Sequence, residues 1–361
     1  MAPAPARILS VATAVPPHVY RQDEIREFVV RLFKGREPGL IRRLAVFENA
    51  QVETRALCMP LESFGAERTF GEKNDLYLEH AFHLSCQAVV TALARAGVTA
   101  AQVDHVIFVT STGLATPTLD ARLANHLGFR RDVTRTPIWG LACSGAAAGI
   151  ARAAEFARAR PASFTLVVSV ELCSLAFQPD DELKLGLVSA ALFADGAAAA
   201  VVAGPDAKPG AGAGALEILD ARSMLWPDSL DVMGWRFDQQ GLHLVLSPEI
   251  PSTVATWLAP ALADFVESHG LMLRDIDPLV PHPGGAKVLD AMAEVLGLPE
   301  FALAHARAVL RDHGNMSSPT CLFVLERALA EGAFRPGRVG LLTAMGSGFS
   351  AESVLLRLAG S

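Results

Sequence analysis

The chain has 361 residues, of which 51% are hydrophobic and 19% are charged, and its formal net charge is −7. This composition indicates a globular protein with a large core in one or two domains, and it excludes a disordered chain. The acidic balance disfavours binding to nucleic acid, because nucleic-acid-binding proteins normally carry a basic surface.

Neither the N-terminal segment nor the cysteines indicate an exported protein. The first ten residues lack the charged start and apolar core of a signal peptide. The most apolar stretch, 185–204, contains Asp195 and several glycines, so we expect core rather than a membrane span. The five cysteines are scattered without a metal-ligand spacing. We therefore expect a cytoplasmic protein with reduced thiols, no metal and no integral membrane association.

Helical periodicity alternates with short β-branched runs along the chain, which predicts an α/β fold. One pattern occurs in both halves: a helix, a strand, a glycine- and serine-rich turn, a second helix and a further strand. We expect the first helix of the two halves near 78–97 and 253–270, the first strand at 105–110 and 278–281, and the later strand at 164–170 and 339–343.

The spacing between the two copies is nearly constant. Asp104 and Asp277, just before the first strand of each half, are 173 residues apart, and Cys143 and Asn315, at the opening of each second helix, are 172 apart. Such a regular offset predicts an internally duplicated fold, with halves at 1–215 and 216–361. Helix ends from both halves would then meet at one central site.

Cys143 lies in the segment Trp139–Gly149, where a turn becomes an alanine-rich helix. The N-terminus of a helix carries partial positive charge and free N–H groups, and both lower the pKa of a cysteine. Its small neighbours leave room for an acyl group on the sulfur. A buried structural cysteine is the alternative reading of this segment alone.

Two further residues extend a site around Cys143. His282 follows an apolar strand in a loop rich in proline and glycine, and Asn315 lies in the second glycine/serine turn. In a papain-like protease, the histidine would deprotonate the thiol and the asparagine would orient the histidine. In a decarboxylating condensing enzyme, both would donate hydrogen bonds to a malonyl thioester oxygen. The duplicated architecture favours condensation.

The motifs are, in chain order, Ala142-Cys143-Ser-Gly145, Leu192-Phe193-Ala-Asp195-Gly-Ala-Ala, His282-Pro-Gly-Gly285, His313-Gly-Asn315-Met-Ser-Ser318 and Met345-Gly-Ser-Gly348-Phe. With them the sequence strongly resembles the thiolase-fold condensing enzymes and, within these, the chalcone synthase-like type III polyketide synthases. The resemblance extends from about Arg7 to Arg357. It implies an α/β fold that is internally duplicated into thiolase-like αβαβα layers, with the nucleophilic cysteine in one half and the histidine and asparagine in the other.

The resemblance also implies a role for each motif residue. Cys143 would accept and elongate the acyl chain, while His282 would keep it ionised and, with Asn315, drive the decarboxylation of malonyl-CoA. Phe193 matches a phenylalanine that separates the CoA tunnel from the reaction cavity. A second such phenylalanine is replaced by Leu244, which would widen or reshape the cavity.

Further cavity and CoA contacts are implied in the same way. A side chain at Thr116 would cross a dimer interface into the partner's cavity, and small, less polar residues at Cys173 and Ala176 would suit an aliphatic chain. The residues expected to line the cavity are Phe193, Leu244, Cys173, Glu171, Ala176, Thr116 and Ser317, and those expected to bind CoA are Arg42, Arg43, Gly284 and Ala286.

Taken together, the resemblance is to bacterial alkylpyrone and alkylresorcinol synthases. It implies a homodimer that loads a medium- or long-chain acyl-CoA, extends it with malonyl-CoA and cyclises the product to an alkylpyrone or alkylresorcinol. No cofactor is expected, since CoA thioesters bring the activation. Two alternatives remain: an enzyme like ketoacyl synthase III that condenses once with an acyl carrier protein, and a non-catalytic acyl-binding protein of the same fold.

Overall fold

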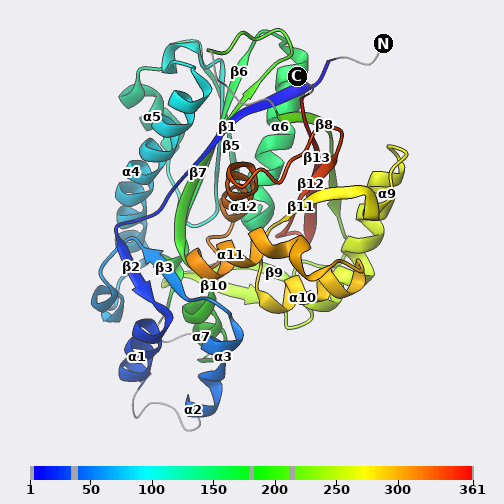
Figure 1. The fold of residues 1–361 in the computed structure, drawn as a ribbon. Coiled ribbons are helices and arrows are strands. Elements are labelled where there is room, and N and C mark those ends of the chain that lie inside the picture. The colour runs from blue at the N-terminus through cyan, green and yellow to red at the C-terminus, as the bar shows by residue number, and fades with distance from the viewer. Residues whose placement is uncertain (1–3, 34–39, 179–182, 211–215, 360–361) are drawn as a thin grey trace.

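The computed structural model describes residues 4–33, 40–178, 183–210 and 216–359. One mixed sheet of nine strands runs through both halves of the chain in the order β11-β12-β13-β8-β1-β7-β6-β4-β5 (Figure 1). The first half contributes β1 (Ala6–Ala14), β4 (His105–Thr110), β5 (Thr134–Trp139), β6 (Phe164–Leu172) and β7 (Asp195–Ala203), and the second half β8 (Leu216–Leu225), β11 (Ile276–Pro281), β12 (Val339–Gly346) and β13 (Ser350–Leu358).

Smaller elements complete the framework. Two small antiparallel pairs are β2 (His18–Arg21) with β3 (Thr54–Leu57) and β9 (Met233–Asp238) with β10 (Gly241–Leu246). The helices are α1 (Gln22–Phe33), α2 (Leu40–Arg43), α3 (Ala45–Asn49), α4 (Phe70–Ala96), α5 (Leu119–Leu127), α6 (Gly145–Ala159), α7 (Leu183–Leu192), α8 (Ile250–Thr253), α9 (Ala259–Glu267), α10 (Ala286–Val295), α11 (Ala304–His313) and α12 (Thr320–Ala330), with a π-helical segment, Val254–Leu258, between α8 and α9.

The predicted duplication is confirmed by the pairing pattern. In the first half β4 pairs parallel with β6, β6 antiparallel with β7, and β7 antiparallel with β1. In the second half β11, β12, β13 and β8 repeat this sequence of parallel, antiparallel and antiparallel pairs. The two copies join where β1 pairs with β8, over Ala6–Ile8. The boundary expected between 215 and 216 adjoins residues 211–215, which lie outside the described residues, and stays a prediction.

The two helices that open at the duplicated turns lie between the halves of the sheet. Helix α6 packs on β4 and β6 and also on β8 and β13, while α12 packs on β1 and β7 and also on β11 and β12 (Figure 1). The small residues of α6 allow this close approach: a Cβ on Gly149 would lie 2.9 Å from Cγ1 of Val167. These are the central layers of the expected thiolase-like fold.

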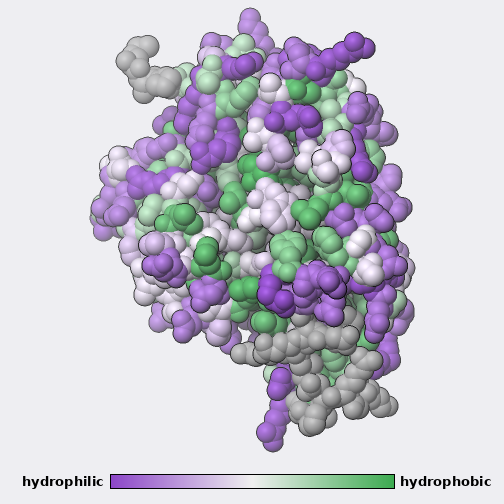
Figure 2. All heavy atoms as spheres, turned by 180° about the vertical axis from the view of Figure 1, so that it is seen from behind, coloured by the Kyte–Doolittle hydropathy of each residue, from purple (hydrophilic) through white to green (hydrophobic). Residues whose placement is uncertain are grey.

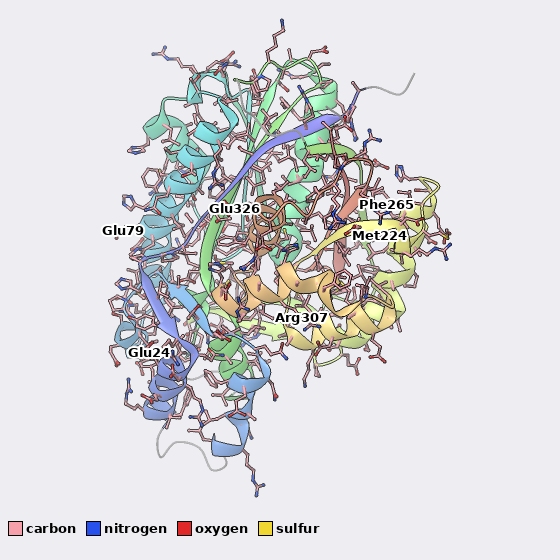
Figure 3. All side chains as sticks on the ribbon, in the orientation of Figure 1. Glu24, Glu79, Met224, Phe265, Arg307 and Glu326 are labelled. Carbon is pink, nitrogen blue, oxygen red and sulfur yellow. The ribbon has the colours of Figure 1, made fainter. Side chains whose placement is uncertain are left out.

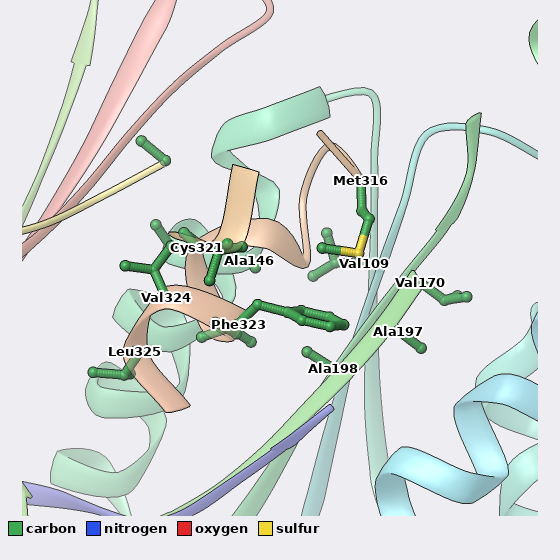
Figure 4. Packing of buried hydrophobic residues seen from close by; sticks show 14 of the residues in the cluster. Val109, Ala146, Val170, Ala197, Ala198, Met316, Cys321, Phe323, Val324 and Leu325 are labelled. Atoms are coloured by element: carbon green, nitrogen blue, oxygen red, sulfur yellow. The ribbon is translucent and has the colours of Figure 1, made fainter. Parts of the chain in front are cut away.

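The core around α12 shows the same close packing. Met316 and Phe323 lie over β7 beside Ala197 and Ala198 (Figure 4). A Cβ on Gly196 would lie 2.5 Å from the sulfur of Met316 and 3.4 Å from the ring of Phe323. The glycine after Asp195 therefore lets the segment carrying Asn315 reach the strand, because any side chain there would displace Met316.

Helix α4 covers the outer face of the first half of the sheet, against β1, β6 and β7. It begins with a capping box, in which Thr69 and Glu72 bond to each other's backbone N–H, and it ends at Gly97 in the left-handed conformation. Near this end, Arg95 forms an ion pair with Glu326 of α12, which is labelled in Figure 3. The pair links the outer helix of one half to the central helix of the other.

The longest helix is amphipathic rather than apolar throughout. Within the part of the chain that the structure describes, none of the helices combines the length and hydrophobicity needed to cross a bilayer.

Candidate active site

Cys143 lies where the sequence predicts it, in a single 3-10 turn, Ala142–Ser144, that runs directly into α6. Ala142 has a positive φ of 47°, a conformation rarely adopted by alanine, and its N–H donates to Oγ of Ser111 at 3.0 Å. Gly346 of β12 packs so tightly that a Cβ there would lie 2.2 Å from Oγ of Ser144. Strands of both halves therefore fix the turn that carries the thiol.

The structure brings Cys143, His282 and Asn315 together on one cavity of about 460 Å³. His282 follows β11 directly, and its N–H donates to the carbonyl of Thr343 on β12 at 2.8 Å. All three residues are buried. The convergence predicted from the duplicated turns is thus found: the thiol comes from the first half, and the imidazole and the amide come from the second.

The backbone of Asn315 is joined to the segment that carries Phe193. Its N–H donates to the carbonyl of Leu192 and its carbonyl accepts from the N–H of Ala194, both at 2.9 Å. The side chain is fixed too: Oδ1 accepts from the N–H of Ser317 at 2.8 Å, and Nδ2 donates to the carbonyl of Gly284 at 3.2 Å. Because a backbone N–H identifies Oδ1 as the acceptor, the NH2 group keeps a second N–H, and this group interacts with the sulfur of Cys143.

Burial dominates the protonation of the site. It raises the pKa of the Cys143 thiol to about 12, against the hydrogen bond with Ser317, and it lowers the pKa of His282 to about 3. Both ring nitrogens of His282 lack a hydrogen-bond partner in the described chain. Desolvation therefore favours a neutral thiol and a neutral imidazole, and it acts against the thiolate that the sequence predicts from the helix terminus.

Phe193 and Leu244 both line the cavity, as expected. Leu244 pairs with Trp235 across β9 and β10, and the Trp235 ring centroid is 6.4 Å from that of Phe193. The carbonyl of Phe193 accepts a 2.9 Å hydrogen bond from Arg55. Arg55 is fully buried, bonds to Gln22 as well, and has its pKa lowered to about 9 by burial.

Basic residues lie at the edge of the same cavity. Arg42 and Arg43 line it and are exposed, and Gly284 and Ala286 line it as expected. The sequence interpretation missed Lys287, which is also exposed there, beside Ala286 at the start of α10. Lys287 follows the His282-Pro-Gly-Gly285 motif closely in the sequence, and this position could have indicated that it lies at the cavity. It also missed Arg55, because nothing in the local sequence marks an arginine as buried.

Three residues that were expected in this cavity do not line it. Glu171 and Ala176 are buried outside it, and Cys173 instead lines a separate apolar cavity of about 40 Å³ behind Phe193. Cys173 and Ala176 belong to a 3-10 turn that follows β6. Thr116 is exposed in the loop before α5, and its expected place in a partner's cavity stays a prediction. Ser317, by contrast, lines the cavity next to Cys143.

Glu171 is the centre of a buried hydrogen-bond network below the site. Its carboxylate accepts from the N–H of Ser111 at 2.9 Å and from the hydroxyls of Thr112 and Ser318, each at 2.7 Å. Ser318 also contacts Ser169, so the network ties β6 to the turn before α12. Burial raises the pKa of Glu171 to about 7 although these donors favour the charged form. No cluster of three or more His, Cys, Asp or Glu side chains among the described residues could hold a metal ion.

Glu171→Gln tests the cost of this buried charge. The pKa of Glu171 is raised from 4.5 to about 7. Protonated Glu171 therefore contributes roughly 3 kcal/mol to the free energy of unfolding. This contribution is complete below pH ~4.5 and is lost as the pH rises through about 7. Glutamine does not titrate, and Ser318 can accept a hydrogen bond as well as donate one. Urea unfolding at about pH 5 and about pH 8 should show the variant gaining on the wild type at the higher pH, and equal pH dependence of the two proteins would contradict this account.

Comparison with known proteins agrees with this geometry. Residues 1–207 match the family model of the N-terminal domain of chalcone and stilbene synthases, and residues 266–358 match that of the C-terminal part of 3-oxoacyl-[acyl-carrier-protein] synthase III. A protein of Bacillus subtilis (strain 168), described as a putative chalcone synthase, is 41% identical over 357 residues, which cover 97% of this chain and 98% of the relative.

Two named synthases are also similar. The 1,3,6,8-tetrahydroxynaphthalene synthase of Streptomyces peucetius subsp. caesius is 42% identical over 352 residues, which cover 97% of this chain and 92% of the relative. The solved structure of the synthase of that name from Streptomyces coelicolor A3(2), described as a bacterial type III polyketide synthase, superposes with a TM-score of 0.92 at 32% identity, covering 98% of this chain and all of that one. The chain therefore belongs to the chalcone and stilbene synthase family and is a type III polyketide synthase.

Proposed function

We propose that this polyketide synthase loads a medium- or long-chain acyl group on Cys143, extends it with malonyl-CoA and cyclises the product to an alkylpyrone or alkylresorcinol. The observation that carries the proposal is the convergence of Cys143, His282 and Asn315 on one cavity whose other walls are mainly apolar. The apolar wall residues include Val188, Leu192, Leu244, Leu246, Ile250, Val288 and Met345.

The loading step follows from the positions of the thiol and the imidazole. His282 takes the proton of Cys143, and the thiolate attacks the thioester carbonyl of the acyl-CoA. The C–S bond to CoA then breaks, and CoA leaves with the electron pair as its thiolate. Because both groups are neutral in the resting site, the charge pair forms only when substrate excludes the remaining water and supplies a reacting carbonyl.

Extension uses donors that line the cavity beside the thiol. The second N–H of Asn315 and a ring N–H of His282 would donate to the thioester oxygen of malonyl-CoA. Loss of CO2 leaves its bonding electron pair as an enolate on that oxygen. The enolate carbon attacks the acyl carbonyl on Cys143, and the thiolate departs. These steps use CoA thioesters alone, so we propose that the enzyme needs no cofactor or metal.

Starter preference decides the product. Two of the relatives described above are named 1,3,6,8-tetrahydroxynaphthalene synthases, whereas the apolar cavity supports an alkyl starter here. The enzyme, offered malonyl-CoA with acyl-CoAs of two to sixteen carbons, should form alkylpyrones or alkylresorcinols fastest from the longer starters, and mass spectrometry identifies them. Cys143→Ala should lose all products, with Cys321→Ala, a buried cysteine outside the cavity, as control. If the enzyme formed products from malonyl-CoA alone at the same rate as with the acyl-CoA starters, the proposal of an alkyl starter would be overturned.

A single-condensation enzyme is the second candidate, because the C-terminal residues match the model of 3-oxoacyl-[acyl-carrier-protein] synthase III. The same assay separates the two functions. Condensation that requires malonyl-acyl carrier protein and stops at one extension would support this candidate, whereas multiply extended products from malonyl-CoA without a carrier protein support the polyketide synthase.

We propose that Arg42 and Arg43 bind the phosphates of CoA at the edge of the cavity. The double variant Arg42→Ala/Arg43→Ala should raise the KM for acyl-CoA several-fold to about tenfold with little change in kcat, and added salt should shrink the difference. Arg274→Ala/Arg335→Ala, at two exposed arginines outside the cavity lining, is the control. A fall in kcat at unchanged KM would show that the pair does not bind CoA.

We also propose that the enzyme is a cytoplasmic homodimer. Strand β5 lies at one edge of the large sheet with mostly exposed side chains, and open strand edges invite pairing. Trp139 at its end is 46% exposed and Leu114 nearby is 41% exposed. The face turned to the viewer in Figure 2 carries apolar side chains grouped in its middle. Thr116 lies in the loop after β4. If two chains pair at the β5 edge, this loop would come close to the cavity of the partner.

The oligomer can be tested at Trp139. Its replacement by glutamate places a charge at the proposed interface, so the particle should fall from twice the mass of the chain to the mass of one chain in light scattering. Phe301→Glu, at an aromatic residue 77% exposed elsewhere on the surface, should leave the mass unchanged. A wild-type monomer, or an unaltered mass of the Trp139 variant, would contradict the proposal.

A further inference from the structure

The hydrogen-bond partner of the Cys143 thiol in the resting site is a serine. Sγ of Cys143 donates to Oγ of Ser317 at 3.6 Å, a normal length for a bond to sulfur. His282 makes no hydrogen bond through either ring nitrogen within the described chain. Ser317 is therefore the side chain that accepts a hydrogen bond from the thiol, and the amide of Asn315 interacts more weakly with the same sulfur.

Ser317 is held firmly in this position. Its φ of 57° lies in the left-handed region, which a serine adopts only when its surroundings impose it. Its N–H donates to Oδ1 of Asn315 at 2.8 Å, and its carbonyl accepts from the hydroxyl of Thr320 at 2.8 Å. Only 3% of its surface is exposed. A non-glycine residue with positive φ costs free energy and persists where the surrounding structure imposes it, most often at functional sites. The strain at Ser317 therefore indicates that the position of its hydroxyl matters for function.

We propose that the hydroxyl of Ser317 is a catalytic hydrogen-bond donor that stabilises the Cys143 thiolate during loading and after each condensation. A hydroxyl can accept and donate. In the resting site the hydroxyl accepts a hydrogen bond from the thiol. When the thiol proton passes to His282, the hydroxyl rotates and donates its own hydrogen bond to the sulfur. Ser317 keeps its proton throughout, so the net transfer is from Sγ to the imidazole.

The charges around Cys143 explain why such a donor is needed. The carboxylate of Glu171 disfavours a negative charge on the sulfur, and the thiols of Cys173 and Cys321 are neutral and buried. On the cavity side, His282 is neutral in the resting site and the ammonium group of Lys287 is exposed. The groups that favour a negative charge on the sulfur are the hydroxyl of Ser317, the amide of Asn315 and the backbone of Cys143, and Ser317 contributes most among them. A donor on the sulfur itself carries more weight in this buried site than it would in water.

This inference rests on the proposed role of Cys143 as nucleophile, but it can be tested without any CoA substrate. The rate of Cys143 alkylation by iodoacetamide is measured against pH, with peptide mass spectrometry to follow this cysteine alone. In Ser317→Ala, which keeps the Cβ and its backbone cost, the midpoint of the profile should move up by about one pH unit or more, and the rate at neutral pH should fall roughly tenfold.

Two further variants make the result decisive. Ser317→Gly tolerates the positive φ, so it stays folded if the alanine variant does not, and it should show the same shift. Ser247→Ala is the control. Ser247 lines the same cavity, but its hydroxyl accepts a hydrogen bond from the N–H of Glu249, so the pH profile of this variant should match the wild type. An unchanged midpoint in the folded Ser317 variants would overturn the inference. Loss of product formation with an unshifted midpoint would show a role for Ser317 in shaping the cavity instead.

Discussion

The site depends on one short backbone pairing between the two halves of the chain. Asn315, from the second half, exchanges hydrogen bonds with Leu192 and Ala194, which flank Phe193 in the first half. This pairing sets the amide donor and the cavity wall in a fixed relation. Arg55 adds to it by bonding the carbonyl of Phe193 from the buried side. The glycine at 196 makes the approach possible, since a side chain there would push Met316 away.

A second constraint is electrostatic. The reacting groups are buried, and desolvation makes the neutral thiol and the neutral imidazole the stable resting pair. Hydrogen-bond donors then matter more than fixed charges, and the turn around Asn315 supplies two of them, the amide of Asn315 and the hydroxyl of Ser317.

Much of this could be predicted from the sequence because it is encoded locally and twice. The strand at 105–110 coincides with β4, and the regular offset between the halves corresponds to two sets of four strands with the same pairing pattern. Cys143, His282 and Asn315 each end a turn or strand marked by glycine or proline, so their convergence follows from the duplication. Cys173 and Ala176 were placed on the cavity by the resemblance alone, and in the structure both lie in the 3-10 turn after β6, outside the lining of that cavity.

The sequence by itself therefore determined the fold class, the family and the three residues of the candidate active site, because periodicity and turn residues act over short distances. Only the tertiary structure decided the protonation of the site, the partner of the thiol and the role of Arg55 behind Phe193. These depend on burial and on contacts between residues more than a hundred positions apart, and no local pattern encodes either. Cys143 is thus a reactive residue by its position in the chain and a neutral thiol by its surroundings in the fold.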